Sequence, residues 1–458
     1  MKLSKPKRNY EMNMCEGPLV PKMLIFTIPL MFSGILQLLF NAADTIVVGR
    51  YAGSQALAAV GSTTSLINLL VNMFMGLSVG ANILISRYYG ARREEDIQET
   101  VHTSITVAAL AGIVLAILGN IFAKPLLILM GSPEDVVELA AIYVKIYFLG
   151  MPVILIYNYG AAILRAIGDT KRPLYYLTAA GVVNVVLNLI FVIGFHMSVA
   201  GVALATILAQ CVSVALLLRC MAKMEGSCRL EFKKLGINKE KAKLLLRYGL
   251  PAGLQGSVFS FSNVLIQSSI NSFGSVAMAG SSAAANIEGF IYTAMNSFQQ
   301  TALCFTSQNL GGGRYERINK VLRNSVLMVA FVGIVMGGGC YFFGEELLGV
   351  YSSDPEVIAY GLTRFKWIGI PYFVCGIMDA LVGMLRGLGY AIVPMFVSII
   401  GACGFRILWI VTVFASHHSL DVLFSSYVIS WILTGGTHLI CYLVVWKKLR
   451  TRLEKKVS

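Results

Sequence analysis

The chain has 458 residues, of which 57% are hydrophobic and only 13% are charged, and its formal net charge is +14. This proportion of charged residues is too small to cover the surface of a soluble protein of this length, so a soluble globular class is excluded. The apolar residues come in runs of about 20 or more, enough to cross roughly 30 Å of hydrocarbon, which predicts an all-α membrane protein. The twelve predicted spans are 22–48, 56–85, 100–123, 134–164, 172–195, 199–221, 244–272, 276–308, 321–343, 356–385, 392–415 and 422–446.

The basic residues gather in alternate connections between these spans, from the tail 1–21 to the tail 447–458. The long basic connection 222–243 is predicted to be a linker, whereas the intervening connections carry mostly acids. The positive-inside rule therefore predicts a multi-pass protein of the cell membrane with cytoplasmic N- and C-termini. Basic loops of this kind are expected to lie against anionic membrane lipids, and nucleic acid is not expected as a partner.

The first predicted span carries the strongest candidate for a functional acid. Gln37, Asn41 and Asp44 follow helical spacing and form a polar stripe on an otherwise apolar helix. A carboxylate in hydrocarbon costs about 2.5–3.5 kcal/mol, so Asp44 should face the bundle interior or a wet cavity, where it can carry a proton or ligate a cation. A polar seam between helices would account for the amides but does not need a carboxylate. Pro29, fifteen residues earlier, interrupts the backbone hydrogen bonds and lets the helix bend.

Two further polar stripes lie in the fifth and sixth predicted spans. Asn184 and Asn188 are four residues apart, as are Thr206 and Gln210. Their oxygens suit a hard cation or a hydrogen-bond relay. Ordinary hydrogen bonds between helices would explain the same residues equally well.

An internal repeat divides the chain into two units of six spans. A shift of about 221 residues aligns Pro29 with Pro251, Asn41 with Asn263, 86–90 with 307–311, and 164–168 with 385–389. Asp44 aligns with Ile266, so this acid is specific to the first unit. Units with six spans each are parallel repeats, which predicts lobes over 22–221 and 244–446 with a binding site between them. A single chain with two matched lobes suits alternating access better than it suits a channel subunit.

The second unit contains two more acids well inside predicted spans. Glu288 and Tyr292 share one face of the eighth span, and Asp379 lies on the tenth. Arg406 in the eleventh span needs an acidic partner, and Asp379 or Glu288 is expected to supply it, which would make one of them structural. The candidate substrate or second-lobe residues are Gln37, Gln210, Gln255, Asn263, Glu288, Tyr292 and Asp379.

No pattern in the sequence predicts catalysis. His417 and Asp421 are near one another in the last outer loop, but no acyltransferase or protease motif surrounds them. No GxxxxGK[ST] motif for ATP occurs either. We therefore expect no enzyme activity, no cofactor and no use of ATP, and any uphill transport must draw on an ion gradient.

Several segments match a family pattern: Ile28-Pro29-Leu30, Phe40 to Arg50, Leu57 to Gly61, Arg165 to Asp169, and Leu385 to Gly389. Over nearly its whole length the chain resembles the bacterial multidrug and toxic compound extrusion (MATE) transporters. The resemblance implies a V-shaped pair of six-helix bundles. It also implies efflux of amphipathic, mostly cationic compounds in exchange for sodium or protons.

The resemblance also assigns roles to residues of the first lobe. Asp44 resembles the cation-coupling aspartate of the family, and Pro29 the proline at which the first helix bends. Asn184 and Thr206 match further members of the cation site, which with Asp44 would hold sodium. Asn188 stands where many relatives carry a second aspartate. The site then has one negative charge, which disfavours tight sodium binding and still allows proton coupling through Asp44. In the seventh span, Phe259 stands where one sodium-coupled branch has a glutamate, with Gln255 nearby.

The expected function is a cation-coupled drug antiporter that works by alternating access, with H⁺ or Na⁺ as coupling ion. The chain is expected to act as a monomer on small organic cations or amphipathic compounds. A flippase for a lipid-linked substrate is the first alternative, but the predicted intramembrane charges are mostly acidic and favour cationic cargo. A non-transporting membrane receptor is the second, and it leaves the intramembrane acids and the bend prolines without a purpose.

Overall fold

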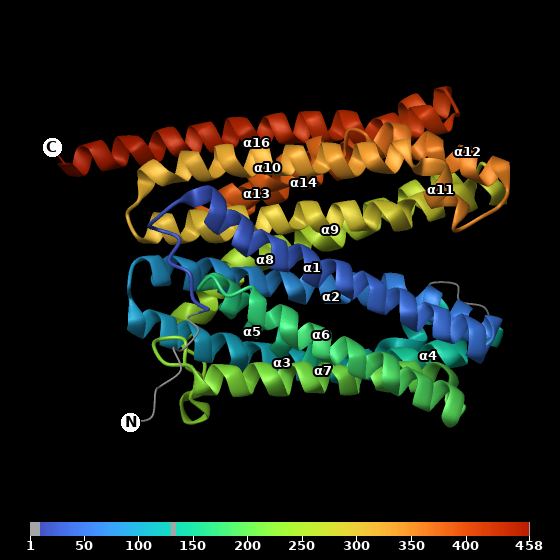
Figure 1. Ribbon diagram of the computed structural model, residues 1–458, viewed down its shortest axis with the longest axis horizontal. Helices are drawn as coiled ribbons and strands as arrows, with labels where there is room; N and C mark the ends of the chain where they lie inside the picture. The colour runs from blue at the N-terminus through green and yellow to red at the C-terminus, as the bar shows by residue number, and fades with distance from the viewer. Residues whose placement is uncertain (1–9, 130–133, 458) are drawn as a thin grey trace, which may run out of the picture.

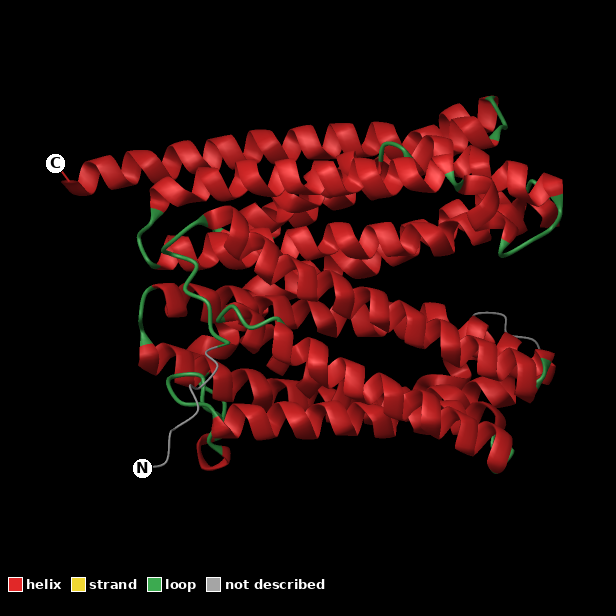
Figure 2. Ribbon diagram, in the orientation of Figure 1, coloured by secondary structure: helices red, strands yellow, loops and turns green. Residues whose placement is uncertain are grey.

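The computed structural model describes residues 10–129 and 134–457, and the regular elements within them are all helices (Figure 2). The first half of the chain contains α1 (Leu19–Val47), α2 (Ser54–Gly90), α3 (Glu94–Leu129), α4 (Glu134–Leu149), α5 (Met151–Ala166), α6 (Lys171–Asn188) and α7 (Ser198–Lys223). The second half contains α8 (Lys239–Asn271), α9 (Ser275–Gly311), α10 (Tyr315–Phe342), α11 (Gly344–Gly349), α12 (Pro355–Arg364), α13 (Tyr372–Gly387), α14 (Ile392–Ser398), α15 (Phe405–Trp409) and α16 (Leu420–Val457).

Several helices continue through wider π-helical turns. Such turns are Val48–Ala52 after α1, Leu189–Gly194 after α6, Phe365–Gly369 after α12, and Ile399–Gly404 and Ile410–Phe414 on either side of α15. The linker between the halves contains a 3₁₀ turn at Phe232–Lys234.

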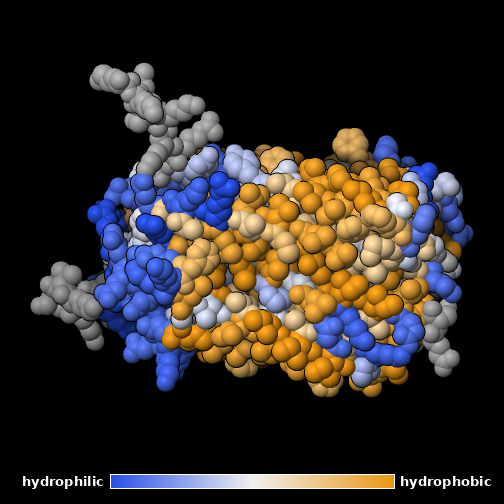
Figure 3. Space-filling view, turned by 90° about the horizontal axis from the view of Figure 1, so that it is seen from below, coloured by the Kyte–Doolittle hydropathy of each residue, from blue (hydrophilic) through white to orange (hydrophobic). Residues whose placement is uncertain are grey.

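The helices group into the predicted membrane spans. In the described chain, seven helical segments are long and apolar enough to cross a membrane, and two bent pairs, α4 with α5 and α12 with α13, add one span each. The three remaining long helices are α2, α8 and α9, which complete the predicted set of twelve. Figure 3 shows a broad hydrophobic surface between two hydrophilic ends, as expected of a protein that crosses a bilayer.

Two of the predicted spans each consist of two helices that meet at a bend. The fourth span bends by 49° between α4 and α5, and the tenth by 42° between α12 and α13. Pro152 and Pro371 lie at these two breaks. A proline ring cannot donate to the helix ladder and clashes with the preceding turn, so each span breaks there.

Two lobes build the molecule, one from α1–α7 and one from α8–α16 (Figure 1). The described chain begins near the end of the molecule at which α16 finishes, and we call this the terminal end. The helix groups lie closer together there than at the opposite end, which is the V-shaped arrangement that the resemblance implied. The tail, lobe and linker boundaries remain predictions, although α16 runs without interruption through the predicted C-terminal tail to Val457.

The two lobes touch where α2 crosses α8. A Cβ atom built on Gly76 would lie 2.0 Å from the backbone nitrogen of Gly253, and one built on Gly249 would lie 2.6 Å from Cα of Leu77. Small residues thus let the two backbones meet directly, as is common between membrane helices.

Helix α1 packs against both lobes. In its first half, Phe26 contacts Phe305 of α9 edge-on, with ring centroids 5.7 Å apart, and Thr27 shares a 2.7 Å hydrogen bond with Thr301 of α9. In its second half, Phe40 packs so closely on α6 that a Cβ atom at Gly181 would lie 1.9 Å from its ring. The helix therefore starts on the second lobe and ends on the first.

Candidate functional site

A chain of polar contacts joins three helices of the first lobe around Asp44. Asn188 Nδ2 donates to Asp44 Oδ1 over 2.5 Å and is 3.2 Å from Asn184 Oδ1. Asn184 Nδ2 in turn donates to Thr206 Oγ1 over 3.3 Å, and Thr206 also interacts with the Asp44 carboxyl. The structure therefore brings Asp44 of α1 together with residues of α6 and α7, including Asn188, which is 144 positions away in sequence.

The residues of this contact chain are buried, so their polar atoms need hydrogen-bond partners within the protein. Asn184 and Asn188 are 6% and 1% exposed, because Phe40 and Gly181 hold α1 tightly against α6. Among the described residues, Asn188 Oδ1 has no hydrogen-bond partner. A buried amide oxygen without a hydrogen-bond donor is unfavourable. This oxygen belongs to Asn188, whose Nδ2 contacts the carboxylate of Asp44. A protonated carboxyl group or a small cation would satisfy it.

Pro29 lies where α1 passes from the second lobe to the first. It is buried, and its carbonyl accepts a 2.8 Å hydrogen bond from Ser33 Oγ. Because proline has no N–H, the carbonyl of Ile25 loses its partner in the helix ladder. The structure thus places a weak point in the helix between its contacts with α9 and the Asp44 site.

Gln37 and Asn41 are on the predicted stripe but do not join the site. Both are exposed on α1, and neither side chain makes a hydrogen bond within the described chain. Gln210 lies on α7 one turn after Thr206, and its buried Oε1 is likewise unpaired among the described residues. Asn263 is exposed on α8.

Glu288 forms an ion pair that the sequence analysis did not predict. Arg364 of α12 donates through Nε and Nη2 to Glu288 Oε2 over 3.0 and 2.9 Å, and through Nη1 to Ser281 Oγ over 2.9 Å. Glu288 and Arg364 are 4% and 9% exposed, and the guanidinium lies over the Phe424 ring. The sequence does not indicate a buried role for Arg364, because this residue stands close to Lys366 near the start of a predicted span. Cations at such positions commonly extend toward the membrane interface.

The predicted partner of Arg406 was therefore wrong. Arg406 donates to Ser430 Oγ over 2.9 Å, and its guanidinium lies 4.0 Å from the centre of the Tyr427 ring. Within the described residues it forms no ion pair with Glu288 or Asp379. Stacking on an aromatic face stabilises the buried cation in place of a carboxylate.

A second polar group surrounds Asp379 on α13. Asp379 is 8% exposed and interacts electrostatically with Arg386, two turns further along the same helix. Arg386 Nη2 donates to Gln255 Oε1 of α8 over 2.8 Å. Tyr292 of α9 is 46% exposed and lies within the electrostatic reach of both charges. The structure thus brings three of the predicted second-lobe residues, Asp379, Gln255 and Tyr292, together around Arg386, whereas Glu288 is held by Arg364.

Two tyrosines near the Asp44 site have no polar pattern in the sequence. Tyr143 and Tyr147 of α4 stack with ring centroids 6.2 Å apart, and both interact electrostatically with Asp44. Their four-residue spacing was the one available signal, and it is equally typical of an ordinary aromatic pair in a core.

A comparison with protein families decides what this fold is. The MatE family model matches the chain twice, over residues 29–190 and 251–412. The chain belongs to the MatE family. The double match falls on the two predicted repeats and covers most of both lobes. The chain is thus a membrane transporter of the multidrug and toxic compound extrusion class, as the motifs indicated.

Relatives and solved structures agree with this assignment. A probable multidrug resistance protein of Bacillus subtilis, YoeA, is 29% identical over 448 residues, covering 94% of this chain and 95% of YoeA. The structure of a multidrug resistance MATE family transporter in an outward-facing conformation is 20% identical, covers 100% of both chains and superposes with a TM-score of 0.86. The Vibrio cholerae MATE transporter VcmN in its bent form is 21% identical, covers 94% of this chain and 97% of that one, and gives a TM-score of 0.85. At these identities the structural matches establish the fold.

Proposed function

We propose that this MatE transporter exports amphipathic, mostly cationic compounds in exchange for H⁺ or Na⁺. The observation that carries the proposal is the Asp44 site: one carboxylate contacts a buried asparagine whose amide oxygen has no partner among the residues that the structure describes. Binding one monovalent cation both neutralises the acid and supplies that missing partner. The printed name of YoeA, a probable multidrug resistance protein, supports drug-like cargo.

The coupling mechanism follows from the position of α1. When Asp44 gains its ion, the carboxylate becomes neutral and its contacts with Asn188 and Thr206 change. The second half of α1 can then shift at Pro29, because the backbone hydrogen bonds are already interrupted there. A shift of α1 alters the space between the lobes and displaces bound substrate. Ion and substrate thus bind in turn to different states of one protein.

Asp44 is the proposed coupling residue, with Asn184, Asn188 and Thr206 completing the cation site and with Asn41 adjacent on α1. For sodium, the ligands would be oxygens of Asp44, Asn184 and Thr206. The substrate-facing set is proposed to include Gln37, Gln210 and Asn263, together with the second-lobe group of Gln255, Tyr292 and Asp379. Glu288 is assigned a structural role, because Arg364 and Ser281 already occupy it.

The proposed orientation places both termini in the cytoplasm. The basic connections of the sequence gather at the terminal end, where the positive-inside rule favours the cytoplasmic face. Under this orientation the lobes diverge toward the outside. The acid at Asp44 would then receive its ion from outside and release it inside.

The flippase and receptor alternatives find less support. A lipid-linked anionic substrate would need a cationic cavity, whereas Arg364 is paired with Glu288, and Arg386 interacts electrostatically with Asp379. A receptor would need neither a buried acid beside an unpaired amide oxygen nor a proline at the junction of two lobes.

Efflux from vesicles tests the proposal. The purified transporter, reconstituted with a fluorescent organic cation, should move it only when a pH gradient or a sodium gradient of the right direction is imposed separately. The gradient that drives transport identifies the coupling ion. Transport without any gradient, or no response to either, would refute coupled antiport. Vesicles without protein control for leakage.

A further inference from the structure

Two side chains at the terminal end reach across the lobe interface in matching ways. Gln308 of α9 donates through Nε2 to the carbonyl of Ala166, the last residue of α5, over 2.7 Å. Arg87 of α2 donates through Nη2 to the carbonyl of Gly387, the last residue of α13, over 3.3 Å. Each bond therefore joins a residue of one lobe to a helix end of the other.

The internal repeat relates these two bonds. A shift of 221 residues maps Arg87 onto Gln308 and Ala166 onto Gly387. Within each lobe the same carbonyl also accepts from a serine, Ser86 at 3.3 Å and Ser307 at 3.1 Å. The last carbonyls of a helix have no partner in their own ladder, so each carbonyl depends on these donors.

Glycines of the repeat bring the lobes into contact at this place. A Cβ atom at Gly90 would lie 2.0 Å from the carbonyl oxygen of Gln308, and one at Gly311 would lie 1.9 Å from that of Arg87. Together the two donors and two acceptors form a pseudo-symmetric structure across the interface, which we call the clasp (Arg87, Ala166, Gln308, Gly387).

The segment before α1 makes additional contacts with Gln308, so the two halves of the clasp are not equivalent. Its residue Met14 is fully buried, donates its N–H to Gln308 Oε1 over 3.1 Å, and accepts at its carbonyl from Asn309 Nδ2 over 3.2 Å. Met12 N donates to the carbonyl of Ile167 in the first lobe over 3.0 Å. We call residues 10–17 the strap.

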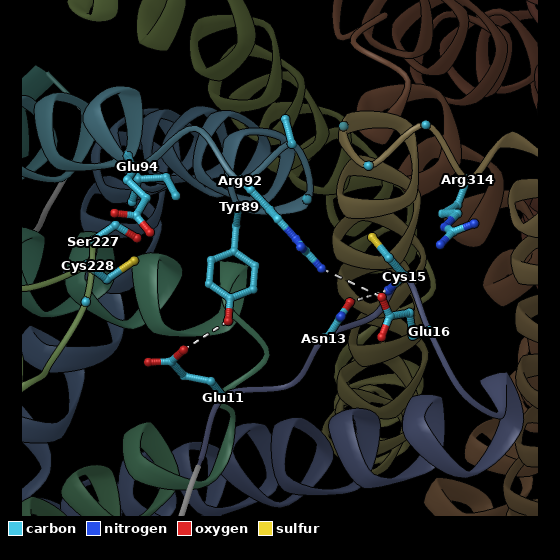
Figure 4. Close-up of a pocket in the computed structure, with 17 residues that line it drawn as sticks. Glu11, Asn13, Cys15, Glu16, Tyr89, Arg92, Glu94, Ser227, Cys228 and Arg314 are labelled. Atoms are coloured by element: carbon cyan, nitrogen blue, oxygen red, sulfur yellow. Dashed lines mark hydrogen bonds and ion pairs between the residues drawn. The ribbon is translucent and has the colours of Figure 1, made fainter.

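The strap continues around a cavity of about 720 Å³ on the terminal end (Figure 4). In that view Glu11 accepts a hydrogen bond from Tyr89 OH at 2.9 Å, and Glu16 pairs with Arg92 at 3.8 Å. Both partners lie at the end of α2 or directly after it. The strap therefore touches both lobes and holds Gln308 from the side opposite Ala166.

We propose that the clasp is the gate at the terminal end and that the strap locks it through Gln308. Separation of the lobes there leaves Gln308 Nε2 and Arg87 Nη2 without their acceptors until water enters, and leaves the carbonyls of Ala166 and Gly387 with only the serine of their own lobe. The strap adds to the free-energy cost of breaking the contact of Gln308 and not to that of Arg87. The proposal rests on the proposed function in one respect, since alternating access requires the lobes to part at this end.

Cys304 offers a native reporter of gate opening. It is fully buried on α9, one turn before Gln308, and its Sγ donates to Asn82 Oδ1 of the first lobe over 3.1 Å. A variant in which only Cys304 is kept, with the other cysteines replaced by alanine, is treated with N-ethylmaleimide in nanodiscs. Because the labelling rate follows the population of the open gate, Arg87→Ala and Gln308→Ala should each raise it at least about fivefold.

Thr306→Val is the matched control. Thr306 is equally buried on the same helix, but its hydroxyl donates to Met384 Sδ within the second lobe. Its labelling rate should stay within about twofold of the parent, because no contact between lobes is lost. Unchanged labelling in Arg87→Ala and Gln308→Ala would overturn the clasp, and so would an equal increase in Thr306→Val.

The strap is tested by fixing it. A Cβ atom at position 312 would lie 2.8 Å from Cys15 Sγ, within disulfide reach, so Gly312→Cys with Cys15 and Cys304 retained should form a bond under mild oxidation. Labelling of Cys304 should then fall and recover on reduction, whereas the same variant with Cys15→Ser should not respond. An oxidised strap that leaves labelling unchanged would remove the strap from the gate. Labelling needs neither cargo nor an ion gradient, so its outcome is separate from that of the efflux assay.

Discussion

Asp44→Asn leaves the transporter folded and abolishes gradient-driven efflux, to the rate of vesicles without protein. Asparagine has the same shape and keeps an oxygen for the hydrogen bond from Asn188 Nδ2. It cannot take up a proton and brings no negative charge for sodium, so the two states of the site no longer differ in charge. Without differential ion binding an ion gradient cannot shift the conformational equilibrium. Efflux of a fluorescent cation from reconstituted vesicles measures the loss.

Two controls accompany this variant. Its free energy of unfolding should change by less than about 1 kcal/mol, because a buried carboxylate with neutral partners is replaced by a neutral isostere. Glu346→Gln, on the exposed start of α11, should transport at the parent rate. Full gradient-driven efflux by Asp44→Asn would show that coupling takes place elsewhere, and Asp379 would be the next acid to change.

Arg364→Met lowers the free energy of unfolding by about 3–5 kcal/mol, because it leaves the carboxylate of Glu288 buried without its cation. The native pair is held by two hydrogen bonds to Glu288 Oε2 and one to Ser281 Oγ. Glu288 Oε1 has no partner within the described chain, so nothing there replaces the lost guanidinium. Thermal or denaturant unfolding in detergent, followed by tryptophan fluorescence, measures the effect.

The double variant Glu288→Leu with Arg364→Met tests whether this ion pair only stabilises the fold or also takes part in coupling. Removing both charges should restore most of the lost stability, since buried ion pairs are often replaceable by packed apolar residues. Lys366→Met is the matched control: it removes an exposed cation two residues away and should cost less than about 1 kcal/mol. A double variant as unstable as Arg364→Met alone, or one that folds but loses coupling, would contradict the structural role of the pair.

The architecture could largely be predicted from the sequence, because each of its signals is local. Apolar runs predict spans, and repeated prolines, glycines and basic motifs reveal the two lobes. The bends at Pro152 and Pro371 have a local cause, but a proline in a membrane helix often only kinks it, so the sequence does not determine how far each span bends. Helices α2, α8 and α9 are less apolar than the other spans, so their apolar signals were weaker.

The site was predictable in part, for a physical reason. Helical spacing identifies the face that a residue shares, and this was enough to select Asp44, Asn184, Asn188 and Thr206. It does not identify what that face meets. Gln37 and Asn41 share the stripe of Asp44 but are exposed, so a shared helix face does not by itself place residues in one site.

Charge pairing between helices could not be predicted from the sequence for the same reason. Arg406 and Glu288 both needed partners, and each found one that spacing cannot reveal: Tyr427 for the arginine and Arg364 for the glutamate. The clasp shows the opposite case. Its residues were already visible as aligned segments of the repeat, but their role at the lobe interface depends on where two helix ends meet.

Ion release on substrate binding tests the central claim most directly. The purified transporter in weakly buffered detergent solution is mixed with a saturating organic cation, while a pH indicator and a sodium-selective electrode follow the solution. Because exchange at one carboxylate links the two binding events, we expect release of about one proton or one sodium ion per protein, and none from Asp44→Asn. Substrate binding without ion release by the parent protein, or equal release by Asp44→Asn, would contradict the account.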